Sequence, residues 1–420
     1  MNKKIKEGIR FKLVSEYRQL FFKDTTNAVE LREVIGKILD DILYHDHTNI
    51  PEQEKDKIVM EIIDEFVGFG PIEDLIKDRF VTEIMINGPD KIYVERHGKT
   101  ELAHVSFDSE QQLLHLIEKI LLPTRRHVDE SNPYTDVSLK DGSRVNIIIP
   151  PLAIDGPTVT IRRFLKEIGR VEDLVNLGSL DKRMADFLVA SILAKINIIF
   201  SGATGAGKTT TLNVLTSYIP NKERIVTIED TAELRLIQDH VVRLEGRQPN
   251  IEGRGEVSIR TLFKNSLRMR PDRIILGEIR GGEALDMLQA ICSGHSGSLA
   301  VIHANSPQDV IYRLETMILT SGVPIILEAI HRQIAAAVNL IVQQEQLADG
   351  TRKVTHISQV KSSKETGVCV EDIFLYELEE IDSEGKVKGQ WKATGVTPLF
   401  YQSFKKAGIT LPENMFKADN

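Results

Sequence analysis

The chain has 420 residues, of which 41% are hydrophobic, 27% charged and 6% aromatic, and its formal net charge is −8. This length predicts two or three domains, and the acidic balance provides no long-range attraction for nucleic acid. The two cysteines, Cys292 and Cys369, are too few for a disulfide framework or a four-cysteine zinc site, and we expect neither a signal peptide nor a membrane span of about 18 uninterrupted apolar residues.

Residues 1–66 are expected to form a helical N-terminal region. Apolar residues recur there at helical spacing, as in Leu31, Ile35 and Ile38. The sequence Gly-Phe-Gly-Pro over 68–71 ends this region, because glycine and proline interrupt a helix.

Residues 67–165 show short strands and turns instead. Two hairpins are predicted over 82–95 and 136–149, the second around Asp-Gly, which is a strong hairpin signal. A helix is predicted between them over 113–122. We therefore expect a mixed α/β domain that ends in a strand over 158–164. A polar linker over 166–180 follows.

The stretch from Ile198 to Thr209 is the most informative part of the chain. An apolar strand leads into a turn that fits the phosphate-loop pattern G-x-x-x-x-G-K-[ST] without a mismatch, and a helical pattern follows. Backbone N–H groups of such a turn point at phosphate oxygens, and the helix adds the positive end of its dipole. The predicted nucleotide-binding residues are Gly202, Ala203, Thr204, Gly205, Ala206, Gly207, Lys208, Thr209 and Thr210.

ATP and Mg²⁺ are the predicted cofactors. Lys208 is expected to reach the β- and γ-phosphates, and the hydroxyl of Thr209 is expected to bind Mg²⁺.

Residues 181–365 alternate between apolar strands and helices, and four strands end in polar residues. The strands cover 196–200, 225–228, 274–276 and 299–302, and the polar residues after them are Ser201, Glu229 with Asp230, Glu278 and His303. The carboxyl ends of parallel strands line the ligand site of an α/β sheet. These side chains are therefore expected to meet at the phosphate loop.

The chain then continues through an amphipathic helix and a strand. The segment 324–342 has apolar residues at helical spacing together with charged ones, so it is expected to be a core helix that runs into a strand. A C-terminal tail over 366–420 is predicted to contain a strand at 370–378 and some helix.

Cleavage of a γ-phosphate requires positioning and charge neutralisation. We expect Glu278 to act on the attacking water and Glu229 to hold Mg²⁺ through its water shell, although the sequence leaves the division between the two acids open. His303, at a strand end, is the better candidate than His295 for sensing the γ-phosphate. No zinc is expected, because neither histidine has metal-ligand spacing with the cysteines.

Strands of the preceding domain carry three arginines, Arg144, Arg162 and Arg163. These are expected to act on a nucleotide only if that domain covers the nucleotide of its own subunit or of a neighbouring subunit.

Together these segments resemble the secretion-type ATPase superfamily that powers type II and type IV secretion and type IV pili. The phosphate loop is similar to its Walker A motif, 227–233 (TIEDTAE) to its Asp box, 270–280 (RPDRIILGEIR) to its Walker B motif and 294–305 to its His box. Walker B ends in Glu278 rather than the Asp usual in other P-loop enzymes, so its Mg²⁺ ligation need not be the same.

The chain also resembles one branch of this superfamily, the CpaF/TadA-type ATPase of tight-adherence (Tad/Flp) pili. The matching stretches are 69–75, 83–89, 141–146, 281–287 and 349–357. The four-cysteine metal insert of type II secretion and type IVa assembly ATPases cannot be present, which argues against those branches.

The resemblance implies an α/β fold with a RecA-like P-loop domain built on a parallel sheet, a smaller PAS-like α/β domain before it and a helical leader. It also implies a homohexamer whose two domains clamp ATP at subunit boundaries, with Arg144 and Arg162 reaching the nucleotide. The expected location is cytoplasmic, peripheral at the inner face of the cytoplasmic membrane through an inner-membrane platform protein, with no direct contact to nucleic acid. Two alternatives remain: a VirB11-type conjugation or type IV secretion ATPase, and a non-catalytic nucleotide-gated scaffold.

Overall fold

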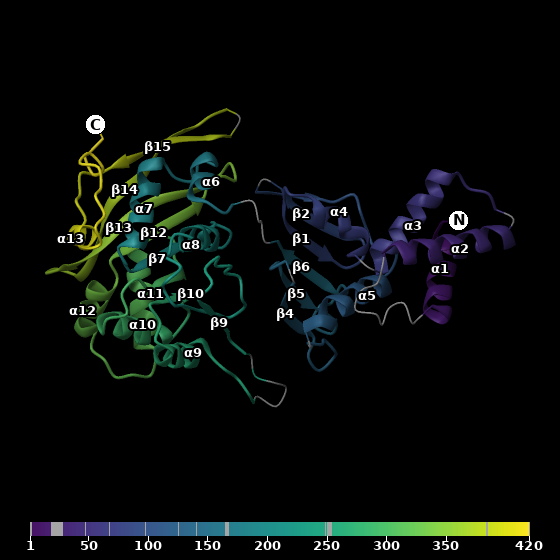
Figure 1. The fold of residues 1–420 in the computed structure, drawn as a ribbon, viewed down its shortest axis with the longest axis horizontal. Coiled ribbons are helices and arrows are strands. Elements are labelled where there is room, and N and C mark those ends of the chain that lie inside the picture. Colours follow the sequence, from purple (N-terminus) through teal and green to yellow (C-terminus); the bar gives the residue numbers. More distant parts are fainter. Residues whose placement is uncertain are drawn as a thin grey trace. The chain divides into compact units, whose positions relative to one another are not determined.

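The computed structural model describes residues 2–17, 28–46, 48–66, 68–96, 98–124, 126–139, 141–163, 168–247, 249, 254–383 and 385–419. The chain divides into two compact units, 1–164 and 165–420 (Figure 1). Residues 164–167 lie outside the described residues; they include the end of the strand predicted over 158–164 and the first two residues of the linker predicted over 166–180. Among the described residues, none of the helices is long and apolar enough to cross a membrane.

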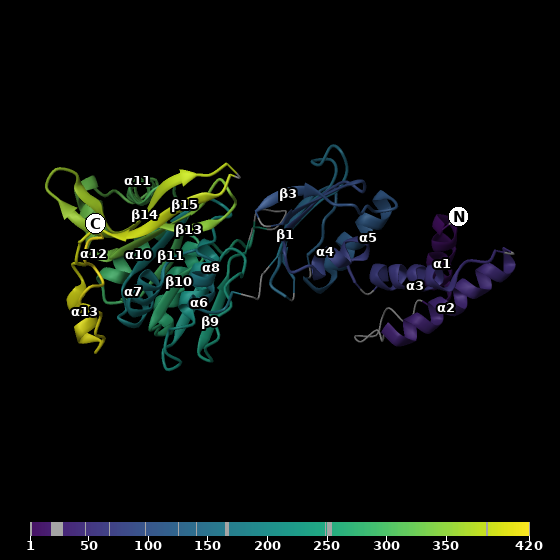
Figure 2. The same ribbon diagram turned by 90° about the horizontal axis from the view of Figure 1, so that it is seen from above.

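Three helices occupy the predicted helical region of unit 1: α1 (Asn2–Glu16), α2 (Ala28–His45) and α3 (Glu52–Phe66) (Figure 2). Their apolar stripes form one buried cluster, in which Ile9, Leu13, Leu31, Ile35 and Ile62 are at most 1% exposed. The helices therefore stabilise each other by burying the faces that their sequence pattern defines.

The rest of unit 1 is a six-stranded antiparallel sheet in the order β3-β2-β1-β6-β5-β4. The strands are β1 (Val81–Asn87), β2 (Lys91–Arg96), β3 (Lys99–Leu102), β4 (Tyr134–Ser138), β5 (Arg144–Ile148) and β6 (Thr158–Arg162). One face packs on α5 (Glu110–Leu121) through alternating apolar residues such as Ile84, Val145 and Ile161. Short helical segments complete the unit: η2 (Gly70–Ile72), α4 (Glu73–Lys77) and η3 (Leu122–Thr124). Both predicted hairpins and the helix between them are confirmed.

A buried lysine on α5 gives unit 1 a pH-dependent stability. Burial lowers the pKa of Lys119 to about 8, although Glu73 and Glu65 lie near it. Its ammonium donates hydrogen bonds to the backbone carbonyls of Glu65 and Gly68. In the folded chain the Lys119 ammonium loses its proton near pH 8, whereas in the unfolded chain it stays protonated up to its ordinary pKa of 10.5. The unfolded state therefore binds more protons between these values, and stability rises with pH in that window.

Replacing Lys119 by methionine should remove this dependence. Between pH 8 and pH 10, wild type should gain up to about 2 kcal/mol of unfolding free energy relative to Lys119→Met, after allowance for partial exposure. Chemical denaturation of the full chain at the two pH values measures the difference. Lys57→Met, at an exposed position on α3, is the matched control. An equal pH response in wild type and Lys119→Met would contradict the assignment.

Unit 2 is built on a nine-stranded mixed sheet in the order β15-β14-β13-β12-β7-β11-β10-β8-β9. The strands are β7 (Ile198–Gly202), β8 (Ile225–Glu229), β9 (Val241–Glu245), β10 (Arg273–Leu276), β11 (Leu299–His303), β12 (Leu340–Gln346), β13 (Arg352–Ser363), β14 (Gly367–Ile381) and β15 (Val387–Ala393). The six strands from β12 to β9 are parallel, and β13 to β15 continue the sheet antiparallel. The predicted parallel arrangement of the four polar-ended strands is thus confirmed.

Helices cover both faces of this sheet (Figure 1). One apolar cluster joins it to α7 (Lys182–Leu193), α8 (Lys208–Thr216) and α13 (Tyr401–Lys406), with α6 (Val171–Asn176) beside them. The cluster on the other face joins it to four helices: α9 (Ile259–Ser266), α10 (Glu283–Cys292), α11 (Pro307–Leu319) and α12 (Leu327–Ala337). The short η4 (Leu267–Met269) follows α9. The predicted helix and strand within 324–342 are α12 and β12.

The C-terminal tail belongs to this core. Phe374 of β14, Phe404 of α13 and Phe416 pack on Phe187 of α7, with ring centroids 5.5–6.0 Å apart. Burial of these rings explains why β14 and β15 extend the sheet rather than form a separate segment.

The amino-terminal edge of the sheet is held by buried polar groups. Arg273 is 1% exposed and donates to the Glu223 carboxylate at 2.6 Å and to the Ile192 carbonyl at 2.8 Å. The Asn197 side chain accepts from the backbone N–H groups of Gly297 (2.7 Å) and Ser298 (3.2 Å) and donates to the Ala337 carbonyl at 2.9 Å.

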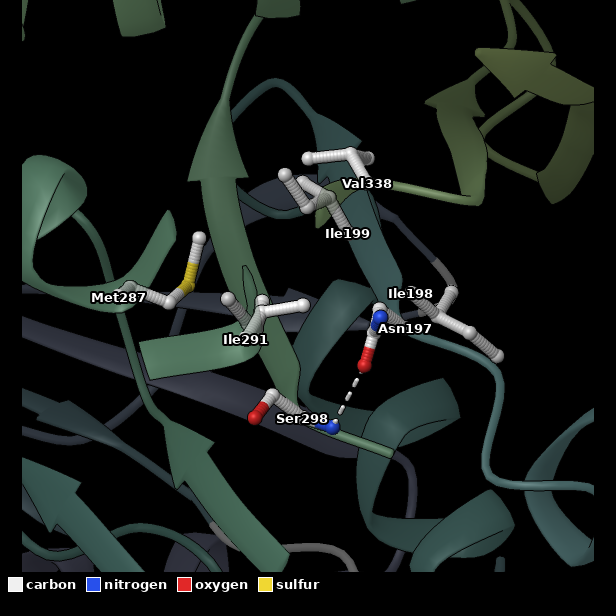
Figure 3. Close-up of a pocket in the computed structure, with 8 residues that line it drawn as sticks. Asn197, Ile198, Ile199, Met287, Ile291, Ser298 and Val338 are labelled. Atoms are coloured by element: carbon white, nitrogen blue, oxygen red, sulfur yellow. Dashed lines mark hydrogen bonds between the residues drawn. The ribbon is translucent and has the colours of Figure 1, made fainter. Parts of the chain in front are cut away.

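A small pocket at this edge is mainly apolar. Figure 3 shows Asn197 turned toward Ser298 at its rim, with Ile198, Ile199, Ile291, Met287 and Val338 around it. The pocket lies at the amino ends of β7 and β11, away from the phosphate loop, and we interpret it as a packing feature.

Candidate active site

The phosphate loop joins β7 to α8 in a conformation that requires glycine. Gly207 has φ 96° and precedes the first residue of α8. A Cβ on Gly202 would lie 2.1 Å from the carbonyl oxygen of Gln344 in β12, which is closer than any side chain allows. The loop is therefore pressed against the neighbouring strand, and its turn precedes the start of a nine-residue helix.

Lys208 is 6% exposed at the start of α8. Its Nζ donates to the carbonyls of Gly202 at 3.0 Å and Ala203 at 2.7 Å and lies 3.4 Å from Nδ1 of His303. Within the loop, Ala206 is buried, Gly205 and Thr209 are partly exposed, and Ala203, Thr204 and Thr210 are exposed. The ammonium is thus fixed at the mouth of the loop, beside the end of β11.

Glu278 and His303 lie together at the carboxyl ends of adjacent strands, β10 and β11. Nε2 of His303 is 3.3 Å from Oε1 of Glu278. Oε2 of the same carboxylate accepts a hydrogen bond of 2.7 Å from Arg280, whose other terminal nitrogen is 3.4 Å from Asp230. A line of groups therefore runs from Lys208 through His303, Glu278 and Arg280 to Asp230.

Burial and the neighbouring charges determine the protonation states of His303 and Glu278. Burial lowers the pKa of His303, and Lys208 adds to that effect, although Glu278 opposes it. Because an ammonium can only donate, Nδ1 of the neutral imidazole accepts and its Nε2–H donates to Glu278. Burial alone would raise the pKa of Glu278, but the hydrogen bond and charge of Arg280, with His303 and Lys208, bring it below its ordinary value. Glu278 is therefore an ionised carboxylate at neutral pH.

Glu229 has a different environment from Glu278. It is 3% exposed, and its Oε2 accepts the backbone N–H groups of Glu233 (2.8 Å) and Leu234 (2.9 Å). Burial raises its pKa. Its Oε1 is buried without a hydrogen-bond partner. One oxygen thus shapes the segment after β8, and the other remains as an acceptor.

This donor set fits Mg²⁺ bound chiefly through phosphates. Among the described residues, no group of three or more His, Cys, Asp and Glu side chains is arranged to hold a metal ion. The Thr209 hydroxyl and the Oε1 of Glu229 are oxygen atoms, the donor type that Mg²⁺ prefers, and Mg²⁺ commonly keeps several waters and binds substrate phosphates. A single accessible hydroxyl is consistent with that chemistry, whereas a metal-bound water would reach the buried Oε1 of Glu229 only after the segment that encloses it moves.

The remaining predicted residues lie apart from this line. Arg144 of β5 and Arg162 of β6 are directly paired in unit 1, on the sheet face opposite α5. Arg163 donates to the backbone carbonyls of Asp78 and Val81 within unit 1. Nδ1 of His295 lies 3.1 Å from the Ala290 carbonyl at the end of α10, which is a local structural contact.

Sequence reasoning missed the contribution of β12 and β13 to the loop. Ser201 donates to the side chain of Gln343, which in turn donates to the Ala304 carbonyl at 3.3 Å. Arg352, at the start of β13, donates from Nε to the Gly205 carbonyl at 2.7 Å. The signal was present: residues 340–346 read LIVQQEQ, an apolar run followed by polar residues, as in the other four strands.

Comparison with known proteins gives a consistent result. The family described as "Type II/IV secretion system protein" matches residues 65–379. The conjugal transfer protein TrbB of Rhizobium radiobacter is 30% identical over 294 residues, which cover 69% of this chain and 87% of that protein. The type IV secretion system protein VirB11 of Bartonella quintana is 29% identical over 327 residues, 68% of this chain and 90% of that protein.

One solved structure is similar in sequence over a comparable part of the chain, but its superposition is weak. The crystal structure of the VirB11 ATPase from the Brucella suis type IV secretion system, in complex with sulphate, has 28% sequence identity and a TM-score of 0.38. The match covers 69% of this chain and 92% of that one.

Proposed function

Because the chain belongs to the type II/IV secretion system protein family, we propose that it is an ATP-hydrolysing motor of a membrane-associated secretion or pilus-assembly machine. The observation that carries this proposal is the line from Lys208 through His303 to Glu278 at the carboxyl ends of adjacent strands. A phosphate loop alone binds a nucleotide, whereas a neighbouring carboxylate and histidine supply groups for hydrolysis.

In the proposed mechanism the loop from Gly202 to Thr210 holds the phosphates, and Lys208 neutralises the β- and γ-phosphate oxygens. Mg²⁺, when bound, supplies further positive charge at the same oxygens, with Thr209 as ligand and Glu229 as acceptor for a bound water. Glu278 orients the attacking water and accepts its proton at a carboxylate oxygen. His303 lies between Lys208 and Glu278, where it senses the γ-phosphate and couples its presence to the Glu278 carboxylate.

We assign the motor to the CpaF/TadA type of tight-adherence pilus ATPases. The five stretches given above, at 69–75, 83–89, 141–146, 281–287 and 349–357, support this branch. In this proposal a homohexamer closes its PAS-like unit over the RecA-like unit that holds ATP. The ring acts at the inner face of the cytoplasmic membrane on an inner-membrane platform protein, and no contact with nucleic acid is required.

A conjugation ATPase is the second candidate. Two relatives favour it: the conjugal transfer protein TrbB and the type IV secretion system protein VirB11. The genes beside the coding sequence separate the two readings: prepilin, prepilin peptidase and two small platform proteins identify a pilus system, whereas relaxase or coupling-protein genes identify conjugation.

Mixed rings should reveal an arginine that acts on a neighbouring subunit. Arg162→Ala and Lys208→Ala subunits should each be inactive alone, and a 1:1 mixture should regain activity at about one quarter of the sites if residues combine independently. A recovered site joins the intact loop of one subunit to the intact Arg162 of the next. Steady-state ATP hydrolysis after subunit exchange measures it.

The matched control mixes Lys208→Ala with Glu278→Gln subunits. Lys208 and Glu278 lie in the same unit, joined through His303, so every site in that mixture carries at least one defect. No recovery is expected there. If the Arg162 mixture also fails to recover at every ratio, Arg162 does not act on a neighbour.

A further inference from the structure

Both oxygens of the Glu278 carboxylate are engaged. Oε1 faces Nε2 of His303 at 3.3 Å, and Oε2 accepts from Arg280 at 2.7 Å. A general base needs an oxygen within hydrogen-bond reach of the water whose proton it takes. Each oxygen keeps a second lone pair for a water, but the hydrogen bond and charge of a paired guanidinium make the carboxylate a weaker acceptor for the proton of that water.

Arg280 is the donor that is able to leave. Its side chain is 60% exposed, whereas His303 is 33% exposed and also faces Lys208. Arg280 has a second acceptor in Asp230, 3.4 Å from its Nη1. Exchange of one carboxylate for another keeps the guanidinium paired, so the movement costs little.

Hydrogen bonds hold the backbone at Arg280, so its contact with Glu278 is a defined part of the fold. The Glu283 carboxylate, on the first residue of α10, accepts the N–H groups of Arg280 at 2.6 Å and Gly281 at 2.7 Å. Glu283 is itself 6% exposed. The main chain after β10 is therefore held, so an exchange of Arg280 between Glu278 and Asp230 requires movement of its side chain alone.

We propose that Arg280 is a positioning residue that keeps Glu278 paired, and so a weaker acceptor for the proton of the attacking water, and that releases Glu278 by transferring to Asp230. This proposal rests on the proposed function, because it assigns a control of hydrolysis to the site described above. Arg280 contacts no phosphate-loop residue in the hydrogen bonds and ion pairs found for the described residues. Its effect should therefore appear in the chemical step and not in nucleotide affinity.

Single-turnover hydrolysis by the full chain with Mg²⁺ and ATP isolates that step from product release. Arg280→Ala should raise the single-turnover rate by about 3- to 10-fold and leave the Kd for ADP within about 2-fold of wild type. Arg280→Lys, which keeps a cation, should return the rate toward wild type. Arg280→Gln, a neutral side chain of similar length, is measured beside Arg280→Ala so that a folding defect in one variant does not decide the result.

Asp230→Asn tests the second position of the switch. Loss of this negative charge should keep Arg280 on Glu278 and lower the rate by about 3-fold or more. In the Arg280→Ala background the same change should have no effect, because the residue through which it acts is gone. Arg332→Ala, at an exposed arginine of α12, should not change either readout.

The outcomes separate the two proposals. Active wild type, inactive Glu278→Gln and an unchanged or slower Arg280→Ala together overturn the role of Arg280 and leave the motor function intact. An Asp230→Asn defect that persists without Arg280 overturns the transfer step. A wild-type chain without ATP hydrolysis, or a fully active Glu278→Gln, overturns the proposed function itself.

Discussion

Replacement of Lys208 by alanine is expected to abolish ATP binding and turnover while the fold remains intact. Its ammonium is held at the mouth of the loop by the carbonyls of Gly202 and Ala203 and is the positive charge that we place on the β- and γ-phosphates. Removal of one such preorganised group typically costs about 10²- to 10³-fold in rate. Titration with a fluorescent ATP analogue and steady-state hydrolysis measure the two losses.

Lys222→Ala, at an exposed lysine after α8, is the matched control and should bind and hydrolyse as wild type does. Thermal unfolding followed by circular dichroism shows whether the variants keep the fold. Unchanged turnover in Lys208→Ala would remove the assignment of the phosphate loop.

Glu278→Gln is the second large effect: the variant should bind ATP with affinity close to wild type and lose hydrolysis by about 10²-fold or more. Glutamine has nearly the same shape and keeps one acceptor oxygen, although its NH2 group must face one of the two donors, His303 or Arg280. Its neutral amide cannot accept the proton of the attacking water. Rapid-quench measurement of phosphate release, combined with nucleotide titration, separates binding from chemistry.

Glu229→Gln is the informative comparison. The structure uses Oε2 of Glu229 to hold the N–H groups of Glu233 and Leu234, a role that a glutamine oxygen can keep. We therefore expect a smaller loss of activity than in Glu278→Gln. Near wild-type activity in Glu278→Gln with a large loss in Glu229→Gln would move the role of base to Glu229.

The sequence predicted the site best where a functional residue belongs to a short motif or directly follows a recognisable strand. The phosphate loop, and the polar residues after the four strands, could be placed because parallel strands bring their carboxyl ends to one edge. The register of β7, β8, β10 and β11 fulfils that expectation, and it brings Glu278, His303 and Lys208 together.

Contacts that depend on packing between distant segments were not predictable. Arg352 lies 147 residues from the loop carbonyl to which it donates, and no periodic pattern links the two. The contrast between Glu229 and Glu278 depends on burial: both acids follow an apolar strand, but only Glu229 is enclosed by the segment after it. The tail over 366–420 has ordinary strand and helix patterns, and only the packing of its phenylalanines on Phe187 shows that it belongs to the core.

The clamped amino-terminal edge of the nine-stranded sheet has a mechanical consequence. Arg273 ties β10 to Glu223 and to the end of α7, and Asn197 ties β7 to the start of β11 and the end of α12. A close-packed interior transmits strain rather than absorbing it. We therefore expect the amino-terminal edge to stay rigid, so that a movement that accompanies phosphate cleavage would occur at the carboxyl ends of the strands.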